Sequence, residues 1–68
     1  MNLMELSPAR TLVRHAGFES RLSHDESRLE VWRAGLIQGV CIGSTMIHRE
    51  GGHAFVSRPV LARILGGA

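Results

Sequence analysis

The sequence contains no lysine and no tyrosine, and it has a single tryptophan and a single cysteine. Because Cys41 has no partner within the chain, no intramolecular disulfide can stabilise the fold. No apolar run approaches the roughly 18 residues that a membrane-spanning helix needs, so we expect no contact with a membrane. The chain has 68 residues, which predicts a single domain over residues 1–68 with a small core and marginal stability.

The composition is that of a folded protein, with 44% hydrophobic and 21% charged residues. A domain of this size has little room for a buried, supported catalytic pocket, so we expect no enzymatic activity and no cofactor. The first residues include Glu5 and no basic side chain before Arg10, unlike a secretory signal. We therefore expect a cytoplasmic protein.

All eight basic residues are arginines, and against six acidic residues they give a net charge of +2. Two explanations of the arginine bias stay open. A GC-rich bacterial genome favours arginine codons, whereas selection for bidentate contacts to phosphate or carboxylate groups would favour the guanidinium itself. The small positive excess is only a weak indication of nucleic-acid binding.

Two local signals predict helices in the first half of the chain. Ser7-Pro8 has the pattern of a helix cap and Gly17 that of a helix end, which predicts a helix over residues 8–16, followed by a short bridge. Ser23-His24-Asp25-Glu26 has the pattern of a capping box and predicts a second helix over about residues 24–36. The apolar stripe of that helix would be Leu29, Trp32 and Leu36. We expect Trp32 to lie at the centre of the core.

The second half has the pattern of a β-hairpin followed by a helix. Residues 39–48 are rich in β-branched side chains, Gly51-Gly52 suits a tight turn, and residues 53–56 have the pattern of a return strand. Ser57 then opens a last short helix. This order predicts an α+β fold, a small winged-helix-like domain with two or three helices, a β-hairpin wing and a C-terminal helix.

Residues 29–65 resemble the second half of winged helix-turn-helix domains. In those domains a helix ends in a Gly-Leu-Ile-like tripeptide, a hairpin with glycines at its tip follows, and Ser or Thr opens the next helix. The corresponding residues here are Gly35-Leu36-Ile37, Gly51-Gly52 and Ser57. The size and the glycine pairs also resemble small T-odd coliphage proteins that inhibit host RNA polymerase. This resemblance implies a phage-encoded regulator acting in a bacterial host cell.

The charges on the predicted helix 24–36 favour docking onto a protein over DNA readout. Three acidic residues accompany only two arginines there, a poor match for a polyanion. We therefore predict a non-catalytic inhibitor or modulator of a host nucleic-acid machine, RNA polymerase or a CRISPR interference complex, contacted through Arg10, Arg14, Arg21, Arg28, Arg33 and Arg49. The alternative is a dimeric winged-helix regulator that binds duplex DNA through His24, Ser27, Arg28 and Arg49.

The cysteine and the histidines give no strong site. Cys41, His48 and His53 have the spacing C-x6-H-x4-H, with His24 as a conceivable fourth ligand, but the paired-cysteine half of structural zinc sites is missing, so we expect no metal. Residues 39–43 match G-x-C-x-G, a thiol form of the nucleophile elbow, without the following helix or the large sheet that this motif requires. We therefore expect Cys41 to be buried as a small hydrophobic residue.

Overall fold

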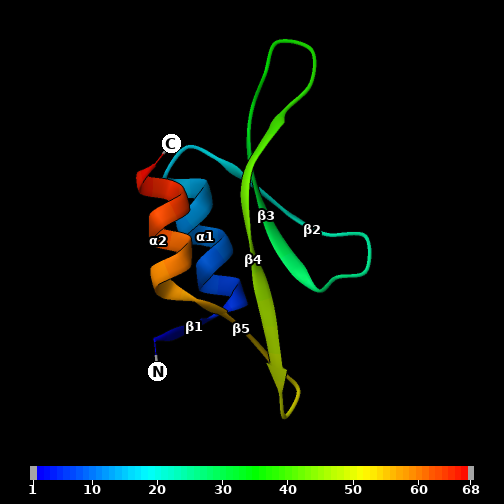
Figure 1. Ribbon diagram of the computed structural model, residues 1–68, viewed down its shortest axis with the longest axis vertical. Helices are drawn as coiled ribbons and strands as arrows, with labels where there is room; N and C mark the ends of the chain where they lie inside the picture. Colours follow the sequence, from blue (N-terminus) through cyan, green and yellow to red (C-terminus); the bar gives the residue numbers. More distant parts are fainter. Residues whose placement is uncertain (1, 68) are drawn as a thin grey trace.

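The computed structural model describes residues 2–67, and within this range the chain forms five strands and two helices. In chain order these are β1 Leu3–Glu5, α1 Leu6–His15, β2 Glu19–Leu22, β3 Arg28–Arg33, β4 Val40–Glu50, β5 His53–Ser57 and α2 Arg58–Gly66. The strands form one antiparallel sheet in the order β1-β5-β4-β3-β2 (Figure 1). The molecule is therefore a small α+β domain with two layers.

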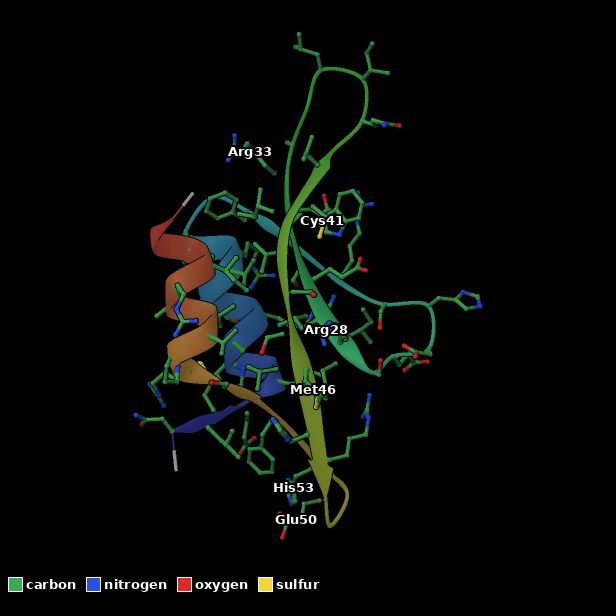
Figure 2. All side chains as sticks on the ribbon, viewed as in Figure 1. Arg28, Arg33, Cys41, Met46, Glu50 and His53 are labelled. Atoms are coloured by element: carbon green, nitrogen blue, oxygen red, sulfur yellow. The ribbon has the colours of Figure 1, made fainter. Side chains whose placement is uncertain are left out.

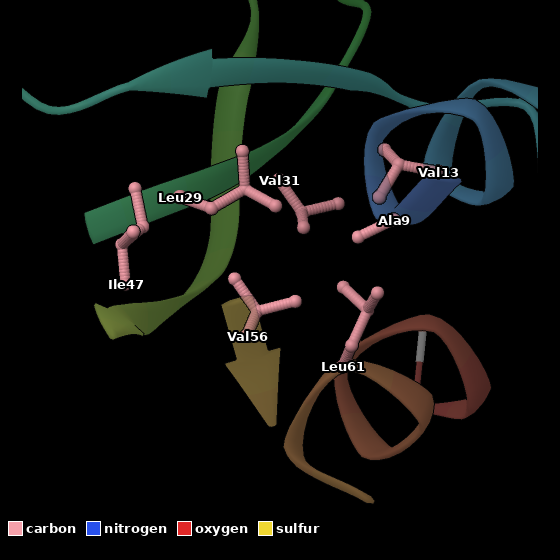
Figure 3. Close-up of a cluster of buried hydrophobic side chains, with 7 residues drawn as sticks. All are labelled: Ala9, Val13, Leu29, Val31, Ile47, Val56 and Leu61. Carbon is pink, nitrogen blue, oxygen red and sulfur yellow. The ribbon is translucent and has the colours of Figure 1, made fainter. Parts of the chain in front are cut away.

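Both helices cover the same face of the sheet, and the opposite face carries no helix (Figure 1). The core lies between the two layers, where each strand contributes alternate apolar side chains and each helix contributes one stripe. Seven buried hydrophobic residues form it: Ala9, Val13, Leu29, Val31, Ile47, Val56 and Leu61 (Figure 3). The tryptophan is not among them.

Strand β4 is the longest element and joins the two halves of the sheet. Residues 40–46 pair with β3, and residues 47–50 pair with β5. The register shifts after Val31, which lies opposite Gly43, while Trp32 lies opposite Cys41, so that Ile42 is the extra residue of a β-bulge. Beyond this bulge the β3–β4 hairpin projects past the helices and gives the molecule extents of 40 × 24 × 15 Å (Figure 1).

The prediction of a winged-helix domain is wrong, because its central helix does not form. Residues 28–33 of the predicted helix 24–36 are strand β3, and the residues before them form a turn. The described chain has two helices and a five-stranded sheet, so the hairpin is part of a sheet rather than a wing beside a helical bundle.

The physical reason lies in the side chains of β3. Leu29 and Val31 alternate with polar neighbours and are both buried, which is the period of a strand. The helical stripe proposed for this segment also required Trp32 and Leu36. Trp32 lies on the opposite face from Leu29 and Val31, and Leu36 is fully exposed. The hydroxyl of Ser23 accepts from the backbone amide of Arg28 at 3.0 Å and thereby closes a turn instead of capping a helix.

The start of the chain also differs from the prediction. Helix α1 begins at Leu6, and Glu5, which precedes it, makes no side-chain capping bond. Ser7 lies inside the first turn, where its carbonyl accepts from the Thr11 hydroxyl at 3.3 Å. The predicted bridge over residues 18–22 contains strand β2, which pairs with β3 along its whole length.

Three other local signals were predicted correctly: Gly17, Gly51-Gly52 and Ser57. Gly17 follows α1 with φ of +91°, and Gly51 and Gly52 form the β4–β5 turn with φ of +57° and +82°. Ser57 caps α2, accepting from the amide of Val60 at 3.4 Å. These signals depend only on neighbouring residues, which explains why the sequence reveals them.

Candidate interaction surfaces

The most exposed apolar side chains of the described chain lie in the loop over residues 34–39, between β3 and β4, which we call the hairpin tip. Leu36 and Ile37 have relative exposures of 107% and 98%. Val40, where β4 begins, is 60% exposed. Large aliphatic side chains fully in water at the end of a projecting hairpin are a typical feature of a contact surface.

Two glycines fix the shape of the hairpin tip. A Cβ atom at Gly35 would lie 2.1 Å from the carbonyl oxygen of Gln38, so only glycine allows the chain to fold back here. At Gly39 a Cβ atom would lie 3.1 Å from the carbonyl oxygen of Arg33 and 3.4 Å from Cε3 of Trp32. The tip is thus a closely folded loop whose two central side chains, Leu36 and Ile37, are fully exposed to solvent.

A polar clip supports the base of the hairpin on the open face of the sheet. The guanidinium of Arg21 lies 4.2 Å from the ring centroid of Trp32 and forms an ion pair with Glu19 at 2.9 Å. The indole Nε1 of Trp32 donates to Glu30 at 2.9 Å. The clip joins β2 to β3 directly below the hairpin tip, and it leaves the tryptophan partly buried rather than central in the core.

Farther along the same face, a second arginine is hydrogen-bonded to neutral groups. Arg28 donates to the hydroxyl and the carbonyl oxygen of Ser44, at 2.9 and 3.3 Å. Met46, opposite Arg28 across the strands, is 54% exposed. Because Glu19 and Glu30 accompany Arg21 and Arg28, this face carries apolar groups and charges of both signs.

The surface of helix α1 carries a different chemistry. Ser7, Arg10, Thr11 and Arg14 have the spacing i, i+3, i+4, i+7 and line one groove of about 580 Å³, which we call the α1 groove. The opposite wall includes the β4–β5 turn, and the remaining lining residues are Glu5, Leu6, Gly52, His53 and Ala54.

Arg10 is held in place at this groove. Its Nε atom donates to the hydroxyl of Ser20 at 3.0 Å, and its Nη2 atom donates to the Ser20 carbonyl oxygen at 3.4 Å. Because a guanidinium has five N–H donors, these bonds orient the side chain and leave further donors for another ligand. Arg14, one turn later, lines the same groove.

The turn before β3 is closed by an acidic side chain. Asp25 accepts from the Ser27 hydroxyl at 2.7 Å, from the Ser27 amide at 3.1 Å and from the Ser23 hydroxyl at 2.9 Å. These hydrogen bonds, led by that of the Ser27 hydroxyl, lower the pKa of Asp25 below its usual value of 3.8. Arg49 reaches the same turn and donates to the carbonyl oxygen of Glu26 at 3.0 Å.

The arginines predicted as one contact surface are divided between two faces. Arg21, over the ring of Trp32, lies on the open face with Arg28. Arg33 ends β3 at the base of the projecting hairpin (Figure 2), and Arg49 lies near the other end of β4. Arg10 and Arg14 lie on α1 in the opposite layer. The residues predicted to contact DNA do not lie on a recognition helix. His24 and Ser27 lie in the turn before β3, whereas Arg28 and Arg49 lie on strands.

The cysteine and the histidines are not assembled into a site. Cys41 is exposed, which corrects the expectation of a buried thiol, and its Sγ donates to the Gly43 carbonyl oxygen at 3.5 Å. In the hairpin register His48 lies opposite Phe55 and His53 opposite Glu50, so the two histidines do not face each other. No group of three or more His, Cys, Asp or Glu residues among residues 2–67 could hold a metal ion.

The sequence prediction missed Leu36 and Ile37 as surface residues. The sequence does indicate a loop here: in Gly35-Leu36-Ile37-Gln38-Gly39 two glycines flank the apolar pair. A short segment flanked by glycines between two segments of β pattern is typical of a hairpin loop. Assigning the first three residues to a helix end hid that signal.

Comparison with known proteins gives no relatives: no family model, no curated protein and no solved structure matches this chain. Among residues 2–67, neither helix has the length and apolar character required to cross a membrane.

Proposed function

We propose that this protein is a non-catalytic binding module that docks onto a partner protein through its hairpin tip. The observation that carries the proposal is the full exposure of Leu36 and Ile37 at the end of a projecting hairpin. As expected from the sequence, we propose a host protein complex that acts on nucleic acid as the partner, RNA polymerase or a CRISPR interference complex, in the cytoplasm of a bacterial host cell.

The energetics favour an apolar pocket on the partner as the docking site. Burying one such aliphatic side chain contributes about 1.5–3 kcal/mol, so Leu36 and Ile37 together contribute about 3–6 kcal/mol. The glycines of the tip and the Arg21–Trp32 clip below it hold the loop in one shape before binding, which lowers the entropy cost of association.

The charges of the open face support a protein partner over duplex DNA for this surface. Arg21 is paired with Glu19, and Glu30 also lies on this face, beside Trp32. The two arginines Arg21 and Arg28 are thus matched by two carboxylates and leave no positive excess for phosphate neutralisation. The winged-helix recognition mode has no structural counterpart here, since residues 28–33 form a strand.

The test is capture of partners from a nuclease-treated bacterial lysate with the tagged protein, followed by titration of the captured protein in purified form. The test variant is the double substitution Leu36→Ser/Ile37→Ser. The control is Leu12→Ser, which removes an exposed leucine (44%) from helix α1 instead. We expect the double variant to bind about 100-fold or more weakly, the equivalent of losing about 3 kcal/mol, and the control to bind like the wild type.

Two outcomes would overturn the proposal. One is a partner that binds the double variant with wild-type affinity while both proteins melt at the same temperature. The other is self-association: if sedimentation shows a dimer that the double variant abolishes, the tip is occupied by a second copy of the chain rather than by a host protein.

A further inference from the structure

The two helices and the rest of the chain carry charges of opposite net sign. Helices α1 and α2 contain four arginines, Arg10, Arg14, Arg58 and Arg63, and no acidic residue. All six carboxylates lie in strands and turns, where with the other four arginines they give a net charge of −2. The overall charge of +2 thus conceals a helical layer of +4, which the composition alone does not indicate.

Within this layer the α1 groove gathers hydrogen-bond donors on one helix face. Ser7, Arg10, Thr11 and Arg14 line it together. Ser7 and the two arginines carry N–H or O–H donors for a ligand, whereas the Thr11 hydroxyl already donates to the Ser7 carbonyl oxygen. The bonds from Arg10 to Ser20 fix its guanidinium at the side of α1 where Arg10 and Arg14 also line a second hollow, of about 360 Å³, with Phe18, Glu19 and Ser20. Glu5 is the one carboxylate among the residues that line the α1 groove.

From this arrangement we infer that the α1 groove binds the sugar–phosphate backbone of a nucleic acid. Arginine presents a planar set of donors that matches a phosphate group bidentately, and hydroxyl groups of Ser and Thr are common additional phosphate contacts. A row of such donors along one helix matches the repeated anionic groups of a backbone. This site makes contacts that do not depend on base sequence.

A membrane surface fits the same charges less well. A helix that lies on a bilayer inserts an apolar face, but the apolar faces of both helices are already buried against the sheet through Ala9, Val13 and Leu61. Apart from Leu12, which is 44% exposed, the large side chains that remain outside on the two helices are polar or basic, as backbone binding requires. The site is also separate from the hairpin tip, so this inference does not rest on the proposed docking function.

The test is fluorescence anisotropy with a labelled duplex DNA of random sequence and, in parallel, the same sequence as single-stranded RNA. For the wild type we expect binding to the duplex with a slope of log K against log salt of about −2 to −4, since two to four phosphates would be neutralised. The variant Arg10→Ala/Arg14→Ala should bind about tenfold or more weakly and should reduce the slope by about 2.

Three comparisons separate a specific groove from a general charge effect. Arg33→Ala/Arg49→Ala removes the same amount of charge elsewhere and should bind nearly as the wild type does. Glu5→Gln removes the carboxylate of the groove without removing a helix cap, because Glu5 makes no capping bond, and should bind more tightly. Leu36→Ser/Ile37→Ser should leave nucleic-acid binding unchanged, so that failure of the docking proposal and failure of this one are distinguishable.

The inference is overturned if neither probe binds at low salt, or if Arg33→Ala/Arg49→Ala weakens binding as much as Arg10→Ala/Arg14→Ala does. It is also overturned if the protein binds vesicles containing anionic lipid but neither nucleic acid, since the layer would then serve a membrane. Preference for the duplex or for the RNA supports the inference in either case and identifies the backbone that fits the groove.

Discussion

Gly43 in β4 offers a test of the packing between the sheet and α2, because strand propensity and the structure predict opposite results. Valine favours strands over glycine by up to about 1 kcal/mol, so propensity alone predicts that Gly43→Val stabilises the protein. The structure predicts the reverse. A Cβ atom at this position would lie 3.0, 3.1 and 3.2 Å from Cγ1, Cγ2 and Cδ1 of Ile64.

The size of the effect follows from these distances. Carbon atoms pack best at about 3.5–4.0 Å, so the Cβ atom alone is too close by roughly 0.3–1 Å, and the two methyl groups of valine add to the crowding. Overpacking of this kind costs about 1–3 kcal/mol. For a domain of this length each kcal/mol shifts the melting temperature by about 4–8 °C, so we expect a decrease of roughly 4–24 °C.

Thermal unfolding followed by circular dichroism measures the decrease, and a second substitution identifies its cause. Ile64→Ala removes the three carbon atoms in contact, so it should cost much less in the Gly43→Val background than in the wild type. Gly66→Ala is the control, because a Cβ atom there meets nothing within 4 Å and alanine favours the helix. A Gly43→Val protein as stable as the wild type, or additive effects of the two substitutions, would refute the close packing of α2 on β4.

Three further predictions concern single contacts. Arg21→Ala should reduce stability by about 0.5–1 kcal/mol and shift the fluorescence emission of Trp32 to the red, because the guanidinium no longer covers the ring; an unchanged spectrum would contradict the clip. The pKa of Asp25 is lowered in the folded state, so the ionised carboxylate stabilises the fold above pH 3.8, and this effect is lost as the pH falls below that value. The difference in melting temperature between wild type and Asp25→Asn should therefore shrink on acidification. A difference that stays constant with pH would contradict this prediction. Ser57→Ala should cost about 1 kcal/mol by removing the cap at the Val60 amide, and Ser57→Thr should restore most of the melting temperature.

The features that the sequence predicted correctly are those that neighbouring residues decide. The Gly51-Gly52 turn, the glycine after α1 and the Ser57 cap each follow from the backbone freedom or the side-chain oxygen of one residue. The segment 24–36 could not be decided in this way. Leu29 and Val31 fit a strand, whereas Leu29, Trp32 and Leu36 fit a helix, and the choice is made by pairing with β2 and β4, which are separate in sequence.

The candidate surfaces show the same division. The i,i+4 spacing of Arg10 and Arg14 on one helix face was predictable, but the second wall of their groove comes from residues 52–54, about forty positions later in the chain. The Ser23 hydroxyl accepts a hydrogen bond from a backbone amide, as the hydroxyl of a helix cap does. Here the amide is that of Arg28, the first residue of a strand, so the bond closes a turn instead. With that helix gone, the apolar pair Leu36 and Ile37 lies in a loop between strands.

The length of β4 fixes a distance between the two surfaces. The strand begins beside the hairpin tip at Val40 and ends at Glu50, next to the turn that forms one wall of the α1 groove (Figures 1 and 2). With a rise of about 3.3 Å per residue, its ends are roughly 33 Å apart. A strand hydrogen-bonded within a sheet resists bending, so β4 acts as a spacer of constant length. The separation of molecules bound at its two ends would therefore be set by the number of residues in one strand.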